Sequence, residues 1–297
     1  MSSVHTTKRI VALSLLLSLQ GCVSARLAQF SGFSQAGVAY VKASGTFIDE
    51  AGSAAIRGDS ALLLKARPDL PQTERRAHVS TANNLLAQRL LLLRQIKRHG
   101  QLLQEYFEVM GSMADSKAPE SLGAAAQGVY DSLARLSPSL KNARIGASTV
   151  SDFIPAVVPI VVAPLKARTL EKELRERGSL IERELALQVA MLTVLSQEIK
   201  TDLTIELNTQ MTQEVVNPYA SADEVPNDWA ARREEILSAS VASQSAGAAA
   251  QAADELRLSF QKLVANEFDS AALTSLIADI NSILDLAEKI KAPNSGV

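Results

Sequence analysis

The sequence predicts an all-α protein, built as an elongated antiparallel bundle of about five or six long helices. Apolar residues recur at alternating spacings of three and four over long stretches, which places them in one stripe along a helix. Aromatic residues make up only 4% of the chain and β-branched runs are few, so a sheet is not expected. Helices of more than about 35 residues are longer than about 50 Å, and the expected domain is therefore a rod.

The N-terminal region has the order of a bacterial export signal. Lys8 and Arg9 come first, the apolar segment 10–19 follows, and a small residue precedes Cys22. The apolar segment holds about ten residues, which is too short to cross a bilayer core of about 30 Å as a helix. We therefore expect it to be removed rather than to anchor the chain.

The run Leu19-Gln20-Gly21-Cys22 resembles the lipobox of bacterial lipoproteins. In that family the cysteine sulfur receives a lipid, and the chain is cut directly before it. The resemblance implies a signal peptide over residues 1–21 and a single helical domain over residues 22–297, held to a membrane by acyl chains such as palmitate on Cys22. Val23 follows the cysteine, and by the same resemblance this favours the outer membrane of the cell envelope.

Cysteine usage agrees with this interpretation. Cys22 is the only cysteine, so no disulfide can form within the chain. Lipidation explains a lone cysteine at this position. The alternative is a generic secretory signal that leaves Cys22 as a free thiol.

Composition and motifs argue against several classes of function. Without residues 1–21 the chain carries 28 basic and 32 acidic side chains, a balance unlike that of a nucleic-acid-binding protein. No P-loop, GxSxG or HExxH motif occurs. His78 and His99 are expected on a helix surface about 30 Å apart, too far to share a metal. We expect no enzyme activity, cofactor, metal or small-molecule substrate.

The first long helix of the bundle is predicted over residues 30–61, and Pro68 and Pro71 end it. Many residues of its stripe are small, which lets a neighbouring helix approach closely. The stripe consists of Phe30, Phe33, Gly37, Tyr40, Ser44, Phe47, Ala51, Ala54, Gly58 and Ala61.

The next helix keeps this register with Ala82, Leu86, Leu93, Ile96, Leu103, Phe107, Met110 and Ala114. Further leucines widen the stripe, namely Leu85, Leu90, Leu91 and Leu92. A helix that is apolar over so much of its circumference is expected between several neighbours.

One side of this second helix is basic and carries Arg89, Arg94, Lys97 and Arg98. One interpretation is a solvated face that acidic neighbours balance, for example Glu171, Glu173 and Glu176. The other is a contact surface for an anionic partner, such as lipid head groups or a cell-wall polymer, through charge attraction that salt weakens.

A third helix is predicted from Pro119 to about Ala143, before an apolar segment of a different kind. Residues 153–165 carry no charge and hold three prolines, which prevent a regular helix interior. The segment is either a buried connector or a tip that contacts membrane through Phe153, Ile154, Val157, Val158, Ile160, Val161 and Val162. A long bundle interrupted by an apolar segment resembles, in architecture alone, the α-helical pore-forming toxins of the cytolysin A type.

The longest helix is predicted over about residues 165–215, with Leu170, Leu174, Ile181, Leu185, Leu192, Leu195 and Ile199 on its buried face. A polar loop from Asn217 to Asp228 follows, and Asn227 or Asp228 is the expected cap of a helix that includes residues 238–253. Asp269 is the expected cap of the last helix, whose seam consists of Leu273, Leu276, Ile280, Leu284, Ala287 and Ile290.

Together these observations predict a lipid-anchored envelope protein that acts as a binding, scaffold or spacer module. Its expected partner is an envelope protein or a second copy. The contact is expected along long helix faces and at the small-residue seams around Gly37–Gly58 and Ala246–Ala253. The alternative is a helical bundle that perturbs membranes through residues 153–165.

Overall fold

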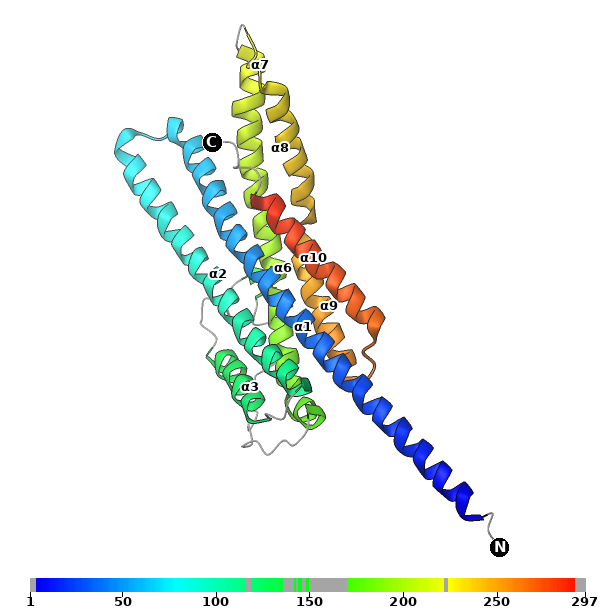
Figure 1. The fold of residues 1–297 in the computed structure, drawn as a ribbon. Helices are drawn as coiled ribbons and strands as arrows, with labels where there is room; N and C mark the ends of the chain where they lie inside the picture. The colour runs from blue at the N-terminus through cyan, green and yellow to red at the C-terminus, as the bar shows by residue number, and fades with distance from the viewer. Residues whose placement is uncertain are drawn as a thin grey trace.

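The computed structural model describes residues 4–115, 119–135, 142, 144–145, 148–149, 170–221 and 224–291. The molecule is an elongated assembly of packed helices (Figure 1), and the all-α fold is confirmed. In the described part of the chain the strands are β1 (Arg144–Ile145) and β2 (Ser148–Thr149), a short antiparallel pair with Arg144 opposite Thr149.

The long helices are α1 (Val4–Ala66), α2 (Gln72–Asp115), α6 (Leu170–Gln210) and α10 (Ser270–Lys291). Shorter α-helices are α3 (Pro119–Ala134), α7 (Asn217–Ser221), α8 (Trp229–Ser243) and α9 (Ala248–Ala265). Tighter or wider turns join some of them, namely the 3₁₀ segments η1 (Arg67–Asp69) and η3 (Gln244–Gly247) and the π-helix η2 (Met211–Val216).

Contacts between side chains give the directions of the main helices. Ser34 of α1 donates to the Phe107 carbonyl of α2, and Asp49 further along α1 meets Lys97, so α1 and α2 are antiparallel. Two polar contacts between α2 and α6, His99 with Glu184 and Arg89 with Asp202, likewise show antiparallel helices. It follows that α1 and α6 run in the same direction.

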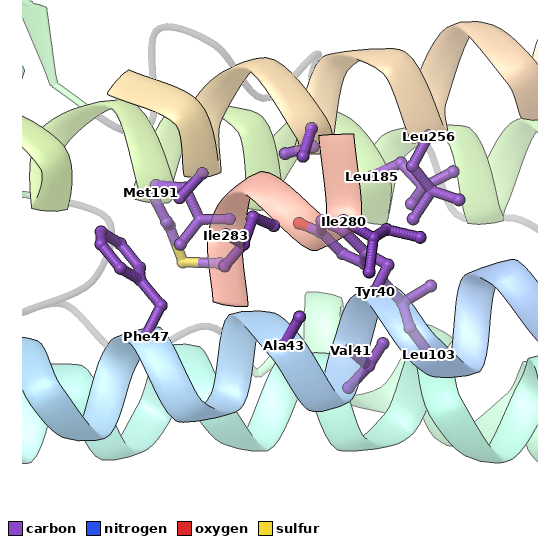
Figure 2. Close-up of a cluster of buried hydrophobic side chains, with 14 of the residues drawn as sticks. Tyr40, Val41, Ala43, Phe47, Leu103, Leu185, Met191, Leu256, Ile280 and Ile283 are labelled. Carbon is purple, nitrogen blue, oxygen red and sulfur yellow. The ribbon is translucent and has the colours of Figure 1, made fainter. Parts of the chain in front are cut away.

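The predicted seam of α1 is the centre of the core. Its members are buried, apart from Ala61, which is half-buried. The Phe33 ring lies 5.6 Å from the ring of Phe107, 5.8 Å from that of Phe260 and 5.5 Å from that of Phe268, measured between centroids. One α1 side chain thus joins α2, α9 and the α9–α10 turn. Figure 2 shows the next layer, in which Tyr40 and Phe47 of α1 point toward side chains from several other helices.

The small residues of the two predicted seams lie where helices of this chain pack closely against one another. A Cβ added at Gly37 would lie 2.6 Å from the Phe107 ring, and one at Gly58 would lie 3.1 Å from the Asp202 backbone. Ala252 and Ala253 of α9 are almost fully buried. These residues bring helices of one chain together, and a contact with a second molecule along the same seams stays a prediction.

Prolines and caps set several helix ends as predicted. The chain turns at Pro68, and α2 begins at Gln72. Asp269 caps the last helix, since its Oδ1 accepts a 2.8 Å hydrogen bond from the Ala272 backbone nitrogen. Helix α8 begins directly after Asp228, where a cap was expected.

Other boundaries differ from the prediction. Helix α3 ends at Ala134 instead of near residue 143, and α1 is the longest helix, with 63 residues against 41 in α6. Asn217 and Pro218 lie in a helix and not in a loop. A proline ring clashes with the carbonyl four residues earlier in an α-helix, and the π-helix that ends at Val216 widens the backbone directly before it.

The apolar stripes predict burial poorly at some positions. The Leu85 and Leu91 side chains are 63% and 52% exposed, because this part of α2 packs mainly along α1 and lacks the several neighbours that were expected. On α10 the predicted seam residue Leu284 is exposed, whereas Ile283 and Leu286 are buried in its place.

We predict that Gly37→Ala lowers the free energy of unfolding by about 1–3 kcal/mol, because the added methyl overpacks the Phe107 ring. The gain of about 1 kcal/mol in helix propensity offsets only part of this cost. Urea unfolding followed by circular dichroism measures the change. Gly247→Ala is the matched control, since nothing lies within 4 Å of its new Cβ. A Gly37→Ala variant as stable as the control would contradict the close approach.

Candidate interaction surfaces

The predicted lipidation site lies outside the packed bundle. Helix α1 carries the backbone of residues 19–22, and Figure 1 shows its N-terminal part extending beyond the other helices. Phe30 is the first buried side chain described along α1, about 12 Å of helix after Cys22. Arg26 marks the edge of the bundle: its guanidinium lies over the Phe30 ring and donates a 2.6 Å hydrogen bond to the Leu263 carbonyl. Cleavage before Cys22 would therefore remove no described core residue.

The four basic residues predicted on α2 do not form one surface. Arg89 is directed to α6, where it makes a bidentate pair with Asp202 and also reaches Glu198 at 3.2 Å. Lys97 is directed to α1 and pairs with Asp49. Arg94 and Arg98 are exposed, and neither pairs with an acid in the described part of the chain.

The acids expected to balance this face have other partners. Glu171 lies 3.9 Å from Arg26, Glu173 pairs with Arg177 on its own helix, and Glu176 lies beside Lys172. The predicted pairing with Glu171, Glu173 and Glu176 is therefore wrong. Arg89 and Lys97 are nevertheless paired with acids, Asp202 of α6 and Asp49 of α1.

The predicted membrane-contact segment, residues 153–165, lies outside the described residues. Its seven named residues from Phe153 to Val162 are therefore not placed. Both interpretations of the segment stay predictions.

A set of buried carboxylates on α6 was not predicted. Four acidic side chains on its inner face are almost fully buried, each between 1% and 7% exposed: Glu173, Glu184, Asp202 and Glu206. Their partners come from three helices. Glu173 pairs with Arg177 of α6, Glu184 with His99 and Asp202 with Arg89 of α2, and Glu206 with Arg57 of α1.

The sequence contains a signal for these positions. Glu173, Glu184, Leu195 and Glu206 are spaced by 11 residues, and 11 residues are close to three helical turns. The acids therefore share a face with a leucine that was already assigned to the core. Three of the partners, Arg57, Arg89 and His99, are distant in sequence, so only the Glu173–Arg177 pair could be read from α6 alone.

His99 is a buried residue, not the surface histidine that was expected. Its Nδ1 lies 3.1 Å from the Glu184 carboxylate, and the Ser132 hydroxyl of α3 lies 3.4 Å away. Gln188 donates to the other side of Glu184 at 3.1 Å. His78 is exposed, near the turn between α1 and α2. The group at His99 joins α2, α3 and α6, and its contacts are those of a structural network.

The described polar groups do not assemble a metal site. In the parts of the chain that are described, no cluster of three or more His, Cys, Asp or Glu side chains could hold an ion. Carboxylates in the core are matched by a basic partner instead. This arrangement favours a structural role for the buried charges.

A cleft of about 320 Å³ lies along the α1–α2 seam. The ion pair between Lys97 and Asp49 lies at this cleft, and Gly45 and Gly100 leave room in its walls. The buried side chains of Ser44 and Gln188 contribute to its lining.

The end of the molecule opposite the N-terminal part of α1 is forked. The turn between α1 and α2 forms one arm, and the α6–α7–α8 region forms the other (Figure 1). Both arms expose large apolar side chains, namely Leu62, Leu64 and Val79 on the first and Val216, Tyr219 and Val225 on the second.

The α1–α2 arm contains an apolar hollow of about 390 Å³, which we call the hairpin hollow. Its lining consists of Ser60, Leu63, Leu64, Arg67, Leu70, Arg75, His78 and Val79. The Arg75 side chain is fixed there by a 3.0 Å hydrogen bond from its Nε to the Leu70 carbonyl.

No family model, curated protein or solved structure matches this chain. The functional interpretation therefore rests on the sequence and on the surfaces described above.

In the described part of the chain, α10 is the one helix whose length and composition would allow it to cross a membrane. Its apolar face packs in the bundle, however. Leu276, Ile280 and Ile283 are almost fully buried, and α10 lies along α1 and α9. One face of α10 is therefore covered by the bundle, whereas Ile277 and Leu284 on the rest of the helix are exposed.

We predict that Glu173→Ala lowers the free energy of unfolding by about 3–5 kcal/mol, because it leaves the buried Arg177 guanidinium without its carboxylate. Glu176→Ala is the control on the same helix, since it removes an exposed pair with Lys172 and should cost less than about 1 kcal/mol. Chemical denaturation compares the variants. Equal losses would show that burial does not govern the energy of these pairs.

We predict that the free energy of unfolding falls at high pH because two tyrosines, Tyr40 and Tyr106, are buried. Burial raises the pKa of the Tyr40 and Tyr106 phenols above the ordinary value. The two phenols contribute fully to the free energy of unfolding below the pKa of an unfolded tyrosine, about 10. As pH rises above that value, the unfolded chain releases the phenol protons while the folded chain still holds them, so the free energy of unfolding falls. Chemical denaturation at several pH values above about 10 should show that the free energy of unfolding falls less in the double variant Tyr40→Phe/Tyr106→Phe than in wild type. Tyr219→Phe, at an exposed side chain, should behave as wild type.

Proposed function

We propose that this protein is a lipid-anchored component of the bacterial cell envelope that works by binding or spacing and not by catalysis. Acyl chains on Cys22 hold it to the outer membrane, and residues 22–297 form the module that projects from it. The observation that carries the proposal is the position of the lipobox-like run at one end of α1, beyond the first core residue, with the apolar fork at the other end.

The dimensions of α1 support a spacer. The helix is continuous from Val4 to Ala66, so the 44 steps from Cys22 to Ala66 correspond to about 65 Å. A membrane-bound Cys22 would thus hold the fork well away from the lipid. The apolar side chains of the fork are exposed far from the membrane that holds Cys22, which favours contact with another protein over contact with that membrane.

The basic residues add a weaker surface of contact. Arg94 and Arg98 are exposed on α2, and their charges are available to an anionic partner such as a cell-wall polymer. Since Arg89 and Lys97 are already paired, this surface is smaller than the sequence predicts.

We predict that the wild-type chain, expressed in a bacterial host, incorporates labelled palmitate and fractionates with the outer membrane, whereas Cys22→Ala does neither. The physical reason is that the thiol of Cys22 is the only one in the chain. Gly247→Ala controls for expression, because it changes an open position far from Cys22.

Two outcomes would contradict the proposal. Equal label in wild type and Cys22→Ala would show that the lipid is not on this cysteine. Leakage of vesicles by the acylated protein would favour membrane perturbation instead, and loss of leakage in Val157→Asp/Val161→Asp would assign it to residues 153–165.

A further inference from the structure

The two arms of the fork carry opposite charge. Residues 60–79, which include the hairpin hollow, hold four basic and two acidic residues. In the described part of the other arm, residues 214–221 and 224–235 hold five acidic and two basic residues. The first arm is thus an apolar hollow with a cationic rim, and the second is an apolar tip with acidic flanks.

The tip of the second arm is firmly built although it is exposed. Tyr219 is 68% exposed, yet its ring stacks on Trp229 with centroids 5.5 Å apart. The Trp229 indole nitrogen donates a 2.9 Å hydrogen bond to the Val215 carbonyl, and Glu214 pairs with Arg232 at 3.1 Å. A preformed aromatic tip loses little conformational entropy when a partner covers it.

The hairpin hollow is the matching element. Leu63, Leu64 and Val79 give it an apolar lining that suits an aromatic ring, and the exposed Arg67 belongs to the same lining. An aromatic anchor that fills an apolar pocket, with charges paired at the rim, is the usual anatomy of a protein interface. Glu224 is exposed near Tyr219, and its negative charge is complementary to the positive charge of Arg67 on a second copy.

We propose that the forked end is a self-association surface, in which the Tyr219 tip of one copy enters the hairpin hollow of a second copy. Both elements lie at the same end of the molecule, so a two-fold axis near this end allows each copy to give one tip and accept one. The inference rests on the proposed function, since it names a second copy as the partner of the anchored module.

The test is sedimentation of the full chain, purified from membranes in detergent, with Leu64→Asp and Tyr219→Asp. Both positions are exposed and outside the buried core, so neither change should unfold the bundle, although Tyr219→Asp also removes the ring that stacks on Trp229. Each is expected to weaken self-association by about tenfold or more. Ile277→Asp on α10 is the matched control, an apolar residue 46% exposed and away from the fork, and it should leave association unchanged.

Mixing the two variants gives a sharper result. A Leu64→Asp copy keeps its tip and a Tyr219→Asp copy keeps its hollow, so a mixed pair retains one intact contact that neither variant can form alone. The mixture is expected to associate more strongly than either variant by itself. Arg67→Glu should weaken association, and Glu224→Arg in the same chain should restore part of it.

Three results would overturn the inference: a monomeric wild type at high micromolar concentration, an equal effect of Ile277→Asp, or no recovery on mixing. Binding of the monomer to anionic phosphatidylglycerol vesicles, lost in Leu64→Asp, would assign the hollow to lipid instead. Palmitate labelling of the same preparations separates the two proposals. An acylated monomer contradicts the inference alone, whereas unlabelled protein contradicts the proposed function.

Discussion

The buried ion pairs of α6 are the constraint on which the rest of the bundle depends. A stripe of leucines can slide by a turn against a neighbouring stripe at little cost, since one apolar contact replaces another. A buried carboxylate cannot, because leaving it without a basic partner costs several kcal/mol. Glu184 and Asp202 fix α2 against α6 at two points, and Glu206 fixes α1 through Arg57. The pairs therefore select one register among the many that the apolar residues would allow.

Close packing along α1 depends on that register. An added Cβ at Gly37 would collide with the Phe107 ring, and one at Gly58 would make an unusually tight contact with the backbone at Asp202. Asp202 is also the partner of Arg89. A place where α1 approaches α6 closely is thus also a place where charge holds α2 on α6, and the three helices are fixed together.

The sequence predicts the elements of this fold better than their partners. Period and proline positions predict the part of α1 from Phe30 to Ala61, α2 and the turn at Pro68, and side-chain chemistry predicts the cap at Asp269. The π-helix before Pro218 and the exposure of Leu85 depend on neighbours that a local pattern does not contain. Likewise the hairpin hollow and the Tyr219 tip become recognisable as surfaces only once the arms are placed, whereas Cys22 is identified by its adjacent residues alone.

The continuity of α1 has a mechanical consequence. One helix passes from the N-terminal extension through the whole core to the turn at the fork. A pulling force applied to its N-terminal end acts along α1, so it loads the contacts of α1 with α2, α6 and α10 together. With Arg57 tied to both Glu206 and the Ile290 carbonyl near the far end, such a load is shared along the length of the molecule. The bundle is therefore arranged to bear tension along its long axis.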